Sequence, residues 1–286
     1  WFQVHTATPD LGSSGDVTPG PRGIIGGGGF NVPTTTYRDS IEYVNIASAG
    51  NSVNFGDLNV ARQYLSATAS RTRGVFSGGQ ASPGLEKTME FVTIASTGNA
   101  TDFGEDHSDM KRCSAGCGNQ TRGLFGSGFT PGPFQPQNVI QYITISSTGN
   151  ANDFGDLVTR SAQRGAFSSS IRGLWCGGYY PSNPDGQIDF VNIASTGNAQ
   201  SFGDLTTPQI RVGGGSNATR GVYFGGQTTP GGSRTGDINY VTIATGGNAV
   251  YFGDLSYTQE WPRMMSSSTR GIVAGGSPGP YIGTLV

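Results

Sequence analysis

Residues 88–105 read Thr-Met-Glu-Phe-Val-Thr-Ile-Ala-Ser-Thr-Gly-Asn-Ala-Thr-Asp-Phe-Gly-Glu, and this stretch decides the fold. Its first half is rich in β-branched and aromatic residues, which favours a β-strand. Residues 97–99, Thr-Gly-Asn, predict a tight turn, because Gly and Asn tolerate the positive φ that hairpin turns require. Residues 101–105 then predict a second strand, so the stretch is a β-hairpin.

The hairpin is one part of a repeat of about 50 residues. Its Gly-Asn turn recurs at Asn51, Asn99, Asn150, Asn198 and Asn248. Phe-Gly-Asp follows the turn at Phe55, Phe154, Phe202 and Phe252, with Phe103-Gly104-Glu105 as the variant. Arg-Gly precedes it at Arg22, Arg73, Arg122, Arg172, Arg220 and Arg270. Internal repeats of this length are typical of propeller blades.

Each copy predicts four strands. In the second copy we expect strands at residues 64–70, 74–77, 89–96 and 101–105. The first of these is a run of small residues, as expected for the strand nearest a crowded central axis, whereas the Phe of the fourth strand can fill the widening gap between blades. No segment has the 3.6-residue periodicity of a helix over three turns.

The sequence therefore predicts an all-β, single-domain fold over residues 1–286, a six-bladed β-propeller of four-stranded blades. The sixth copy lacks an outer strand, and Phe2 precedes Arg22 by 20 residues, close to the 18 between Phe55 and Arg73. We therefore expect the N-terminal strand to join the last blade and close the ring, which would protect the sheet edges. The expected blades cover residues 9–58, 61–107, 110–157, 159–206, 209–256, and 262–286 plus 1–6. A piece of a seven-bladed ring is the alternative.

Composition excludes several classes of protein. The net charge of −2 gives no basic footprint for nucleic acid. No run approaches the roughly 20 apolar residues of a membrane span, so we expect no membrane insertion. Because the chain begins with Trp1, we expect a processed product or a segment of something longer. Three cysteines do not describe a disulfide framework, and we expect them to be small buried residues: Cys113, Cys117 and Cys176.

Catalytic and metal-binding patterns are weak. The two histidines, His5 and His107, lie near no Ser or Cys motif, and Gly-x-Ser-x-Gly does not occur. Residues 26–29 are four glycines, but the Lys-Ser/Thr ending of a phosphate loop is missing. We therefore expect no enzymatic activity, no cofactor and no metal site. A propeller enzyme is the least favoured alternative.

An acidic residue also recurs at one position of the repeat, and two roles are considered for it: Asp57, Glu105, Asp156, Asp204 and Asp254. We expect these residues to serve as structural partners of the repeated arginines, by an ion pair or a capping contact in each blade. A calcium ligand at each turn is the alternative, because calcium prefers carboxylate and carbonyl oxygens.

The chain resembles the kelch family over nearly its whole length. The resemblance rests on the Gly pair after a short apolar strand, as at Gly78-Gly79, on the hydrophobic third strand and on the aromatic residue of the fourth. The chain departs from the family in that Phe stands where kelch repeats usually carry Trp. The resemblance implies a propeller, and propellers serve many functions.

The sequence of residues 93–104, Thr-Ile-Ala-Ser-Thr-Gly-Asn-Ala-Thr-Asp-Phe-Gly, resembles the repeats of proteins encoded by bacteriophages. This resemblance implies a structural or receptor-binding protein of a virion, in a tail fibre, tail tip or capsid decoration. The implied location is the virion surface or extracellular space, with other virion proteins or host glycans and proteins as partners and with symmetric copies on a larger assembly. The alternative is a secreted or cell-surface module that binds glycans.

Binding is expected on one face of the disc. The Arg-Gly and Gly-Asn turns hardly change between copies and belong to one face, whereas the loops of the opposite face vary and carry Pro, Tyr and Phe. Loops on a rigid scaffold are where function concentrates. Aromatic residues stack on sugars and anchor protein contacts. The expected contact residues are the aromatics of these loops: Phe129, Phe134, Tyr179, Tyr180, Tyr257 and Trp261.

Overall fold

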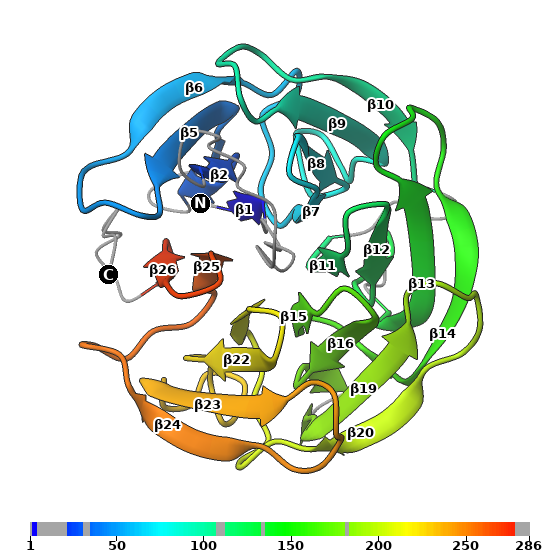
Figure 1. Cartoon of the computed structure of the whole chain (residues 1–286), viewed down its shortest axis with the longest axis vertical. Helices are drawn as coiled ribbons and strands as arrows, with labels where there is room; N and C mark the ends of the chain where they lie inside the picture. Colours follow the sequence, from blue (N-terminus) through cyan, green and yellow to red (C-terminus); the bar gives the residue numbers. More distant parts are fainter. Residues whose placement is uncertain are drawn as a thin grey trace.

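A computed structural model describes residues 2–4, 22–30, 35–106, 112–132, 135–180 and 183–277. In these ranges every regular element is a β-strand, which confirms the all-β prediction. Small antiparallel sheets stand side by side around a central axis, as the blades of a β-propeller (Figure 1).

Five of the sheets have four strands each, and we number these blades in chain order. From the axis outward, blade 1 contains β1 (Phe2–Val4), β2 (Arg22–Gly26), β5 (Ser40–Asn45) and β6 (Val53–Asp57). Blade 2 contains β7 (Ser66–Ala69), β8 (Arg73–Ser77), β9 (Thr88–Thr93) and β10 (Thr101–Glu105). Blade 3 contains β11 (Ala115–Gly118), β12 (Arg122–Gly126), β13 (Gln137–Thr144) and β14 (Asn152–Ser161).

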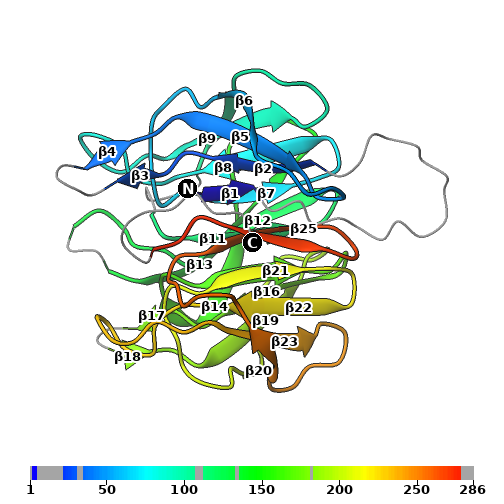
Figure 2. The same ribbon diagram turned by 90° about the vertical axis from the view of Figure 1, so that its left-hand side faces the viewer.

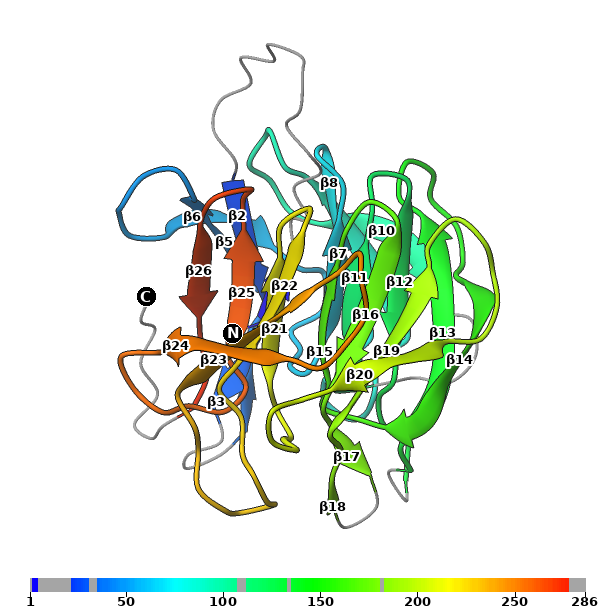
Figure 3. The same ribbon diagram turned by 60° about the horizontal axis from the view of Figure 1, so that its bottom comes forward.

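Blade 4 contains β15 (Gly165–Ser168), β16 (Arg172–Cys176), β19 (Gln187–Asn192) and β20 (Gln200–Asp204). Blade 5 contains β21 (Gly213–Ser216), β22 (Arg220–Phe224), β23 (Asp237–Thr242) and β24 (Val250–Asp254). Two short hairpins lie in loops: β3 (Gly29–Phe30) with β4 (Thr36–Tyr37), and β17 (Tyr179–Tyr180) with β18 (Asn183–Pro184). Figure 3 shows the β17–β18 hairpin projecting from one end of the blades.

The prediction of six blades is wrong, because the structure shows five. The sixth position holds a two-stranded sheet, β25 (Arg263–Ser266) and β26 (Gly271–Ala274), between blades 5 and 1. Among the described residues no further strand lies outside β26. Residues 281–286, expected as a third strand, lie outside the described ranges.

The expected closure by the N-terminal strand is also wrong. β1 pairs with β2 of blade 1, with Phe2 opposite Gly26 and Val4 opposite Ile24, and it lies beside β7 near the axis (Figure 2). In the other blades the inner strand comes directly before the Arg-Gly strand and covers its inner edge. In blade 1, β1 covers the inner edge of β2 instead. This pairing gives partners to the backbone N–H and C=O groups of β2 that would otherwise be unpaired next to the axis.

Small residues line the axis, as predicted. All four residues of β7, Ser-Ala-Thr-Ala, are buried. A Cβ on Gly116 of β11 would lie 2.2 Å from the Ala67 carbonyl oxygen of β7, closer than real contacts allow. Neighbouring inner strands thus approach so closely that some positions admit only glycine.

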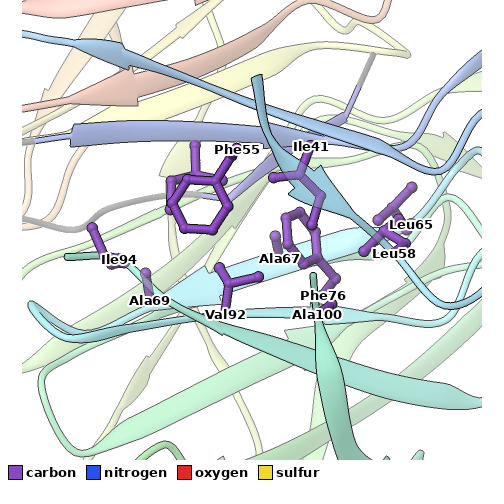
Figure 4. Close-up of a cluster of buried hydrophobic side chains, with 11 residues drawn as sticks. Ile41, Phe55, Leu58, Leu65, Ala67, Ala69, Phe76, Val92, Ile94 and Ala100 are labelled. Atoms are coloured by element: carbon purple, nitrogen blue, oxygen red, sulfur yellow. The ribbon is translucent and has the colours of Figure 1, made fainter. Parts of the chain in front are cut away.

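The core lies between blades. Figure 4 shows the first of these clusters, in which Phe55 of blade 1 lies among Val92, Ile94 and Ala100 of blade 2. The corresponding residues Phe103, Phe154 and Phe202 are at most 6% exposed. Each ring also makes an edge-on contact with an aromatic residue on the third strand of its own blade, as Phe103 does with Phe91 at 6.0 Å. The repeated Phe therefore seals the gap between one blade and the next.

Candidate functional site

The repeated arginines hold neighbouring blades together. Nη1 of Arg73 donates to the carbonyls of Ile145 (3.2 Å) and Ser146 (2.8 Å) at the end of the third strand of blade 3. Its guanidinium lies 4.5 Å from the centroid of the Phe91 ring in its own blade. The same two-carbonyl contact to the next blade is made by Arg22, Arg122 and Arg172. Arg220 lies over the Tyr240 ring, and Arg270 donates to the Ile46 carbonyl of blade 1 at 3.2 Å.

The repeated acids act through their backbone. The Asp57 amide donates to Oδ1 of Asn99 at 3.1 Å, and the Asp57 carbonyl accepts from the Ala100 amide at 2.8 Å. The same pair of bonds recurs at Glu105, Asp156 and Asp204. Ion pairs between the repeated arginines and these acids are absent from the described residues, because the guanidinium groups face backbone carbonyls instead. We place both sets in the seams between blades, away from a ligand site.

Strained backbone marks the mouth of the channel on the variable-loop face. In blades 2 to 5 and in the two-stranded sheet, a residue just before the inner strand has φ between 58° and 63° without being glycine: Tyr64, Cys113, Gln163, Arg211 and Trp261. Such a conformation costs about 1–3 kcal/mol for each residue and tends to occur at functional sites. We call these five residues the collar.

Backbone hydrogen bonds join the collar residues from blade to blade. The Cys113 amide donates to the Tyr64 carbonyl at 2.9 Å, and the Gln163 amide donates to the Cys113 carbonyl at 3.1 Å. The chain of bonds continues from Arg211 to Gln163 at 3.0 Å and from Trp261 to Arg211 at 2.9 Å. The positive φ turns each amide toward the preceding blade, so the strain is offset by one bond per step. The collar is therefore a rigid frame for its side chains.

Aromatic and arginine side chains gather on this frame. The rings of Tyr64 and Trp261 lie 5.3 Å apart. Arg112 lies 5.7 Å from the Tyr64 ring centroid, and Arg211 lies 5.5 Å from that of Trp261. Phe129 and Tyr179 from the variable loops join them, with ring centroids 6.0 Å apart. We call these six residues the channel-mouth cluster.

Polar contacts fix the guanidinium groups of the cluster. Arg112 donates to Oε1 of Gln80, and Arg211 forms an ion pair with Glu260. Glu260 also pairs with Arg234 at 3.0 Å. Since both arginines of the cluster are held by side chains of the same face, their positions are defined before any ligand arrives.

The channel behind the mouth is narrow. Its cavity of about 40 Å³ has room for roughly two or three water molecules. Arg164 lines it and is paired with Asp189 at 2.6 Å and Asp185 at 2.7 Å. Burial raises the pKa of Asp189, and burial lowers that of Arg263, a second lining residue, to about 10. Among the described residues, this cavity therefore admits water and no larger ligand.

The predicted contact residues do not all come together. Phe129, Tyr179 and Trp261 lie in the channel-mouth cluster. Tyr180 is 50% exposed on β17, and Tyr257 is half-buried in the loop before the two-stranded sheet; neither belongs to the cluster. Phe134 lies outside the described residues. Sequence reasoning missed Tyr64, Arg112 and Arg211, because residue types vary at these positions and positive φ is expected of glycine.

Other chemistry finds little support in the described part of the chain. His5 and His107 lie outside it. Within it, no three His, Cys, Asp or Glu side chains gather in a way that could hold a metal ion, and no helix is long and apolar enough to cross a membrane. All three cysteines are buried and free, as expected, and burial raises the pKa of Cys113 and Cys176 to about 12. They are poor nucleophiles at neutral pH.

Comparison with known proteins adds no assignment. No protein-family model matches the chain, and no curated protein sequence matches it either.

Proposed function

We propose that this propeller is a non-catalytic binding module whose ligand, a protein or a glycan, lies across the channel-mouth cluster. The observation that carries the proposal is the collar. Non-glycine residues with strained backbone recur before five inner strands. Such recurring strain points to a frame whose role is to hold the side chains of the channel-mouth cluster in place. Rigid loops and strand ends on such a scaffold are the usual place of recognition.

The chemistry of the cluster suits a ligand with both a flat face and acidic or hydroxyl groups. Tyr64 and Trp261 offer ring faces for stacking on a sugar or for anchoring an interface side chain. The guanidinium groups of Arg112 and Arg211 lie beside those rings and donate hydrogen bonds in a fixed fork. Acidic sugars and acidic peptide segments combine these features.

Substitution at Trp261 tests the proposal. Binding of the protein to an array of acidic and neutral glycans, and to candidate surface proteins, should be lost or weakened at least about tenfold in Trp261→Ala, as for an interface anchor. Ile171→Ala is the matched control, because Ile171 is 62% exposed at the Arg-Gly turn on the opposite face. Equal binding by the Trp261→Ala variant and the wild type would place the ligand elsewhere.

The biological setting that we propose is a virion surface, with a secreted or cell-surface module as the alternative. The support is the resemblance of residues 93–104 to bacteriophage repeat proteins. Electron microscopy of the native assembly tests it. Symmetric copies on a particle are expected, and a protein found only as a free monomer would contradict it.

A further inference from the structure

Within the part of the chain that the structure describes, one gap between blades is open, and we propose that it binds a β-hairpin of the repeat's own type, consisting of a third and a fourth strand joined by a Gly-Asn turn. We call this gap, bordered by β24, β26 and the Gly50-Asn51 turn, the open seam. The inference is independent of the proposed function, because the open seam and the channel-mouth cluster share no residue.

The four closed seams define what a seam requires. In each, the outer-strand Phe carbonyl accepts from the turn glycine of the next blade, as Phe55 does from Gly98 at 2.7 Å. The residue two positions after this Phe makes two further bonds, to the turn Asn and to the residue after it. The Gly of Phe-Gly-Asp allows this approach: a Cβ on Gly56 would lie 2.2 Å from the Gly98 carbonyl oxygen. The same arrangement recurs at Gly104, Gly155 and Gly203.

β24 has the same receptor groups, and no described turn docks on them. Phe252 is 59% exposed, whereas the four equivalent phenylalanines are at most 6% exposed. A Cβ on Gly253 would meet no atom within 4 Å. Among the described residues, no turn donates to the Phe252 or Asp254 carbonyl, and no Asn side chain accepts from the Asp254 amide.

The opposite border has the complementary groups. The Gly50-Asn51 turn of blade 1 corresponds to the turns that dock in the closed seams, yet the Asn51 carboxamide has no hydrogen-bond partner within the described ranges. The inner half of this gap is filled, because Met265 and Ala274 of the two-stranded sheet pack against Val44 and Ile46 of blade 1. In the outer half, no described strand pairs with β26 on the side away from β25.

A single hairpin of the repeat satisfies all three borders. Its first strand would pair with β26, its Gly-Asn turn would dock on β24, and its Phe-Gly-Asp strand would receive the Gly50-Asn51 turn. Residues 278–286 contain no Gly-Asn and cannot supply the turn. The other Gly-Asn turns of the chain are docked in closed seams, so a second copy could offer only its own open seam.

A peptide tests the proposal directly. Residues 187–205, added to the full chain as a synthetic peptide, should bind and raise the midpoint of thermal unfolding by linkage. The matched peptide with Asn198→Ala should bind roughly tenfold more weakly, because it lacks the carboxamide that accepts from the Asp156 amide in the chain and would accept from the equivalent Asp254 amide of β24. Phe252→Glu in the chain should abolish binding, and Ile171→Glu, equally exposed on another surface, should leave it unchanged.

Because an isolated hairpin is marginally stable, a fusion provides a second arm. In this fusion, residues 187–205 are joined after Val286 through a flexible linker. The fusion should raise the midpoint of thermal unfolding more than the same fusion with Asn198→Ala does. Equal midpoints for the two fusions, together with no peptide binding at about 1 mM, would overturn the proposal. So would a concentration-dependent dimer in analytical ultracentrifugation that Phe252→Glu dissociates, since a second copy would then cover the seam.

Discussion

Replacement of Arg122 by Met tests whether the repeated arginines stabilise the ring. The variant loses two charge-assisted hydrogen bonds, to the Ile193 carbonyl at 3.0 Å and the Ala194 carbonyl at 2.9 Å. It also loses the contact with the Tyr142 ring, 4.9 Å from the guanidinium carbon. Bonds to charged groups contribute about 1.5–3 kcal/mol each, but one acceptor is exposed and the other only partly buried, so we discount the two bonds to about 1 kcal/mol each. With about 0.5 kcal/mol for the ring contact, the expected loss is about 2–3 kcal/mol.

Urea unfolding followed by tryptophan fluorescence measures this loss as a fall in the free energy of unfolding. Arg160→Met is the matched control, because Arg160 is exposed on the outer strand of blade 3, and its loss should stay within about 0.5 kcal/mol. Arg122→Lys should recover only part of the stability, because a single ammonium does not reproduce the planar fork. If Arg122→Met were as stable as its control, the account of the seams would be refuted.

The remaining predictions concern other features of the same ring. Gly104→Ala should lower the free energy of unfolding by about 2 kcal/mol or more, because φ of Gly104 is 141° and the new Cβ would lie 2.4 Å from the Gly149 carbonyl oxygen. Gly253→Ala is the control and should have little effect, because no atom lies within 4 Å of its new Cβ. Equal urea midpoints for the two variants would contradict this prediction. Arg164→Ala should cost about 3–5 kcal/mol by leaving the Asp189 carboxylate buried without its cation, while Asp189→Asn together with Arg164→Met should cost less. The native thiols should not react with a disulfide reagent at pH 8 and should react in denaturant. Burial raises the pKa of Cys113 and Cys176 to about 12, so the folded state keeps two thiol protons that the unfolded state loses above about pH 8.5. The contribution of these thiols to the free energy of unfolding should therefore fall between about pH 9 and 11. Replacing both cysteines by Ala should make the fall in the free energy of unfolding with pH less steep.

The repeat made most of each blade predictable from the sequence. Small residues at the axis, the Gly-Asn turn and the Phe that seals the next gap all appear at fixed offsets, so residues such as Asn99 and Phe103 could be assigned in advance. The number of blades could not, because the 20 residues from Phe2 to Arg22 match the 18 of an outer strand, whereas the other inner strands, such as the one that begins at Ser66, start 7 residues before their Arg-Gly. Only the pairing of Phe2 with Gly26 decides between them.

The candidate site was only partly predictable, because tertiary contacts create it. Trp261 was expected as a loop aromatic, but the collar depends on a positive φ that amides of neighbouring blades stabilise, and no local sequence preference indicates this for Tyr64 or Arg211. The partners of the repeated arginines were also missed. A sequence shows that Arg73 and an acid recur together, but not which carbonyls of the next blade lie within reach.

Amide hydrogen exchange on the unmodified protein most directly tests the central claim, a ring of blades joined by repeated seams, one of which has no described turn docked on β24. The amides of Gly98, Gly149, Gly197 and Gly247 donate across closed seams and should exchange at least about a hundredfold more slowly than exposed loop amides. The Gly50 and Ser52 amides, which border the open seam, should exchange at the rate of an exposed loop. Protection of Gly50 and Ser52 equal to that of Gly98 would show that the seam is closed and would contradict the account.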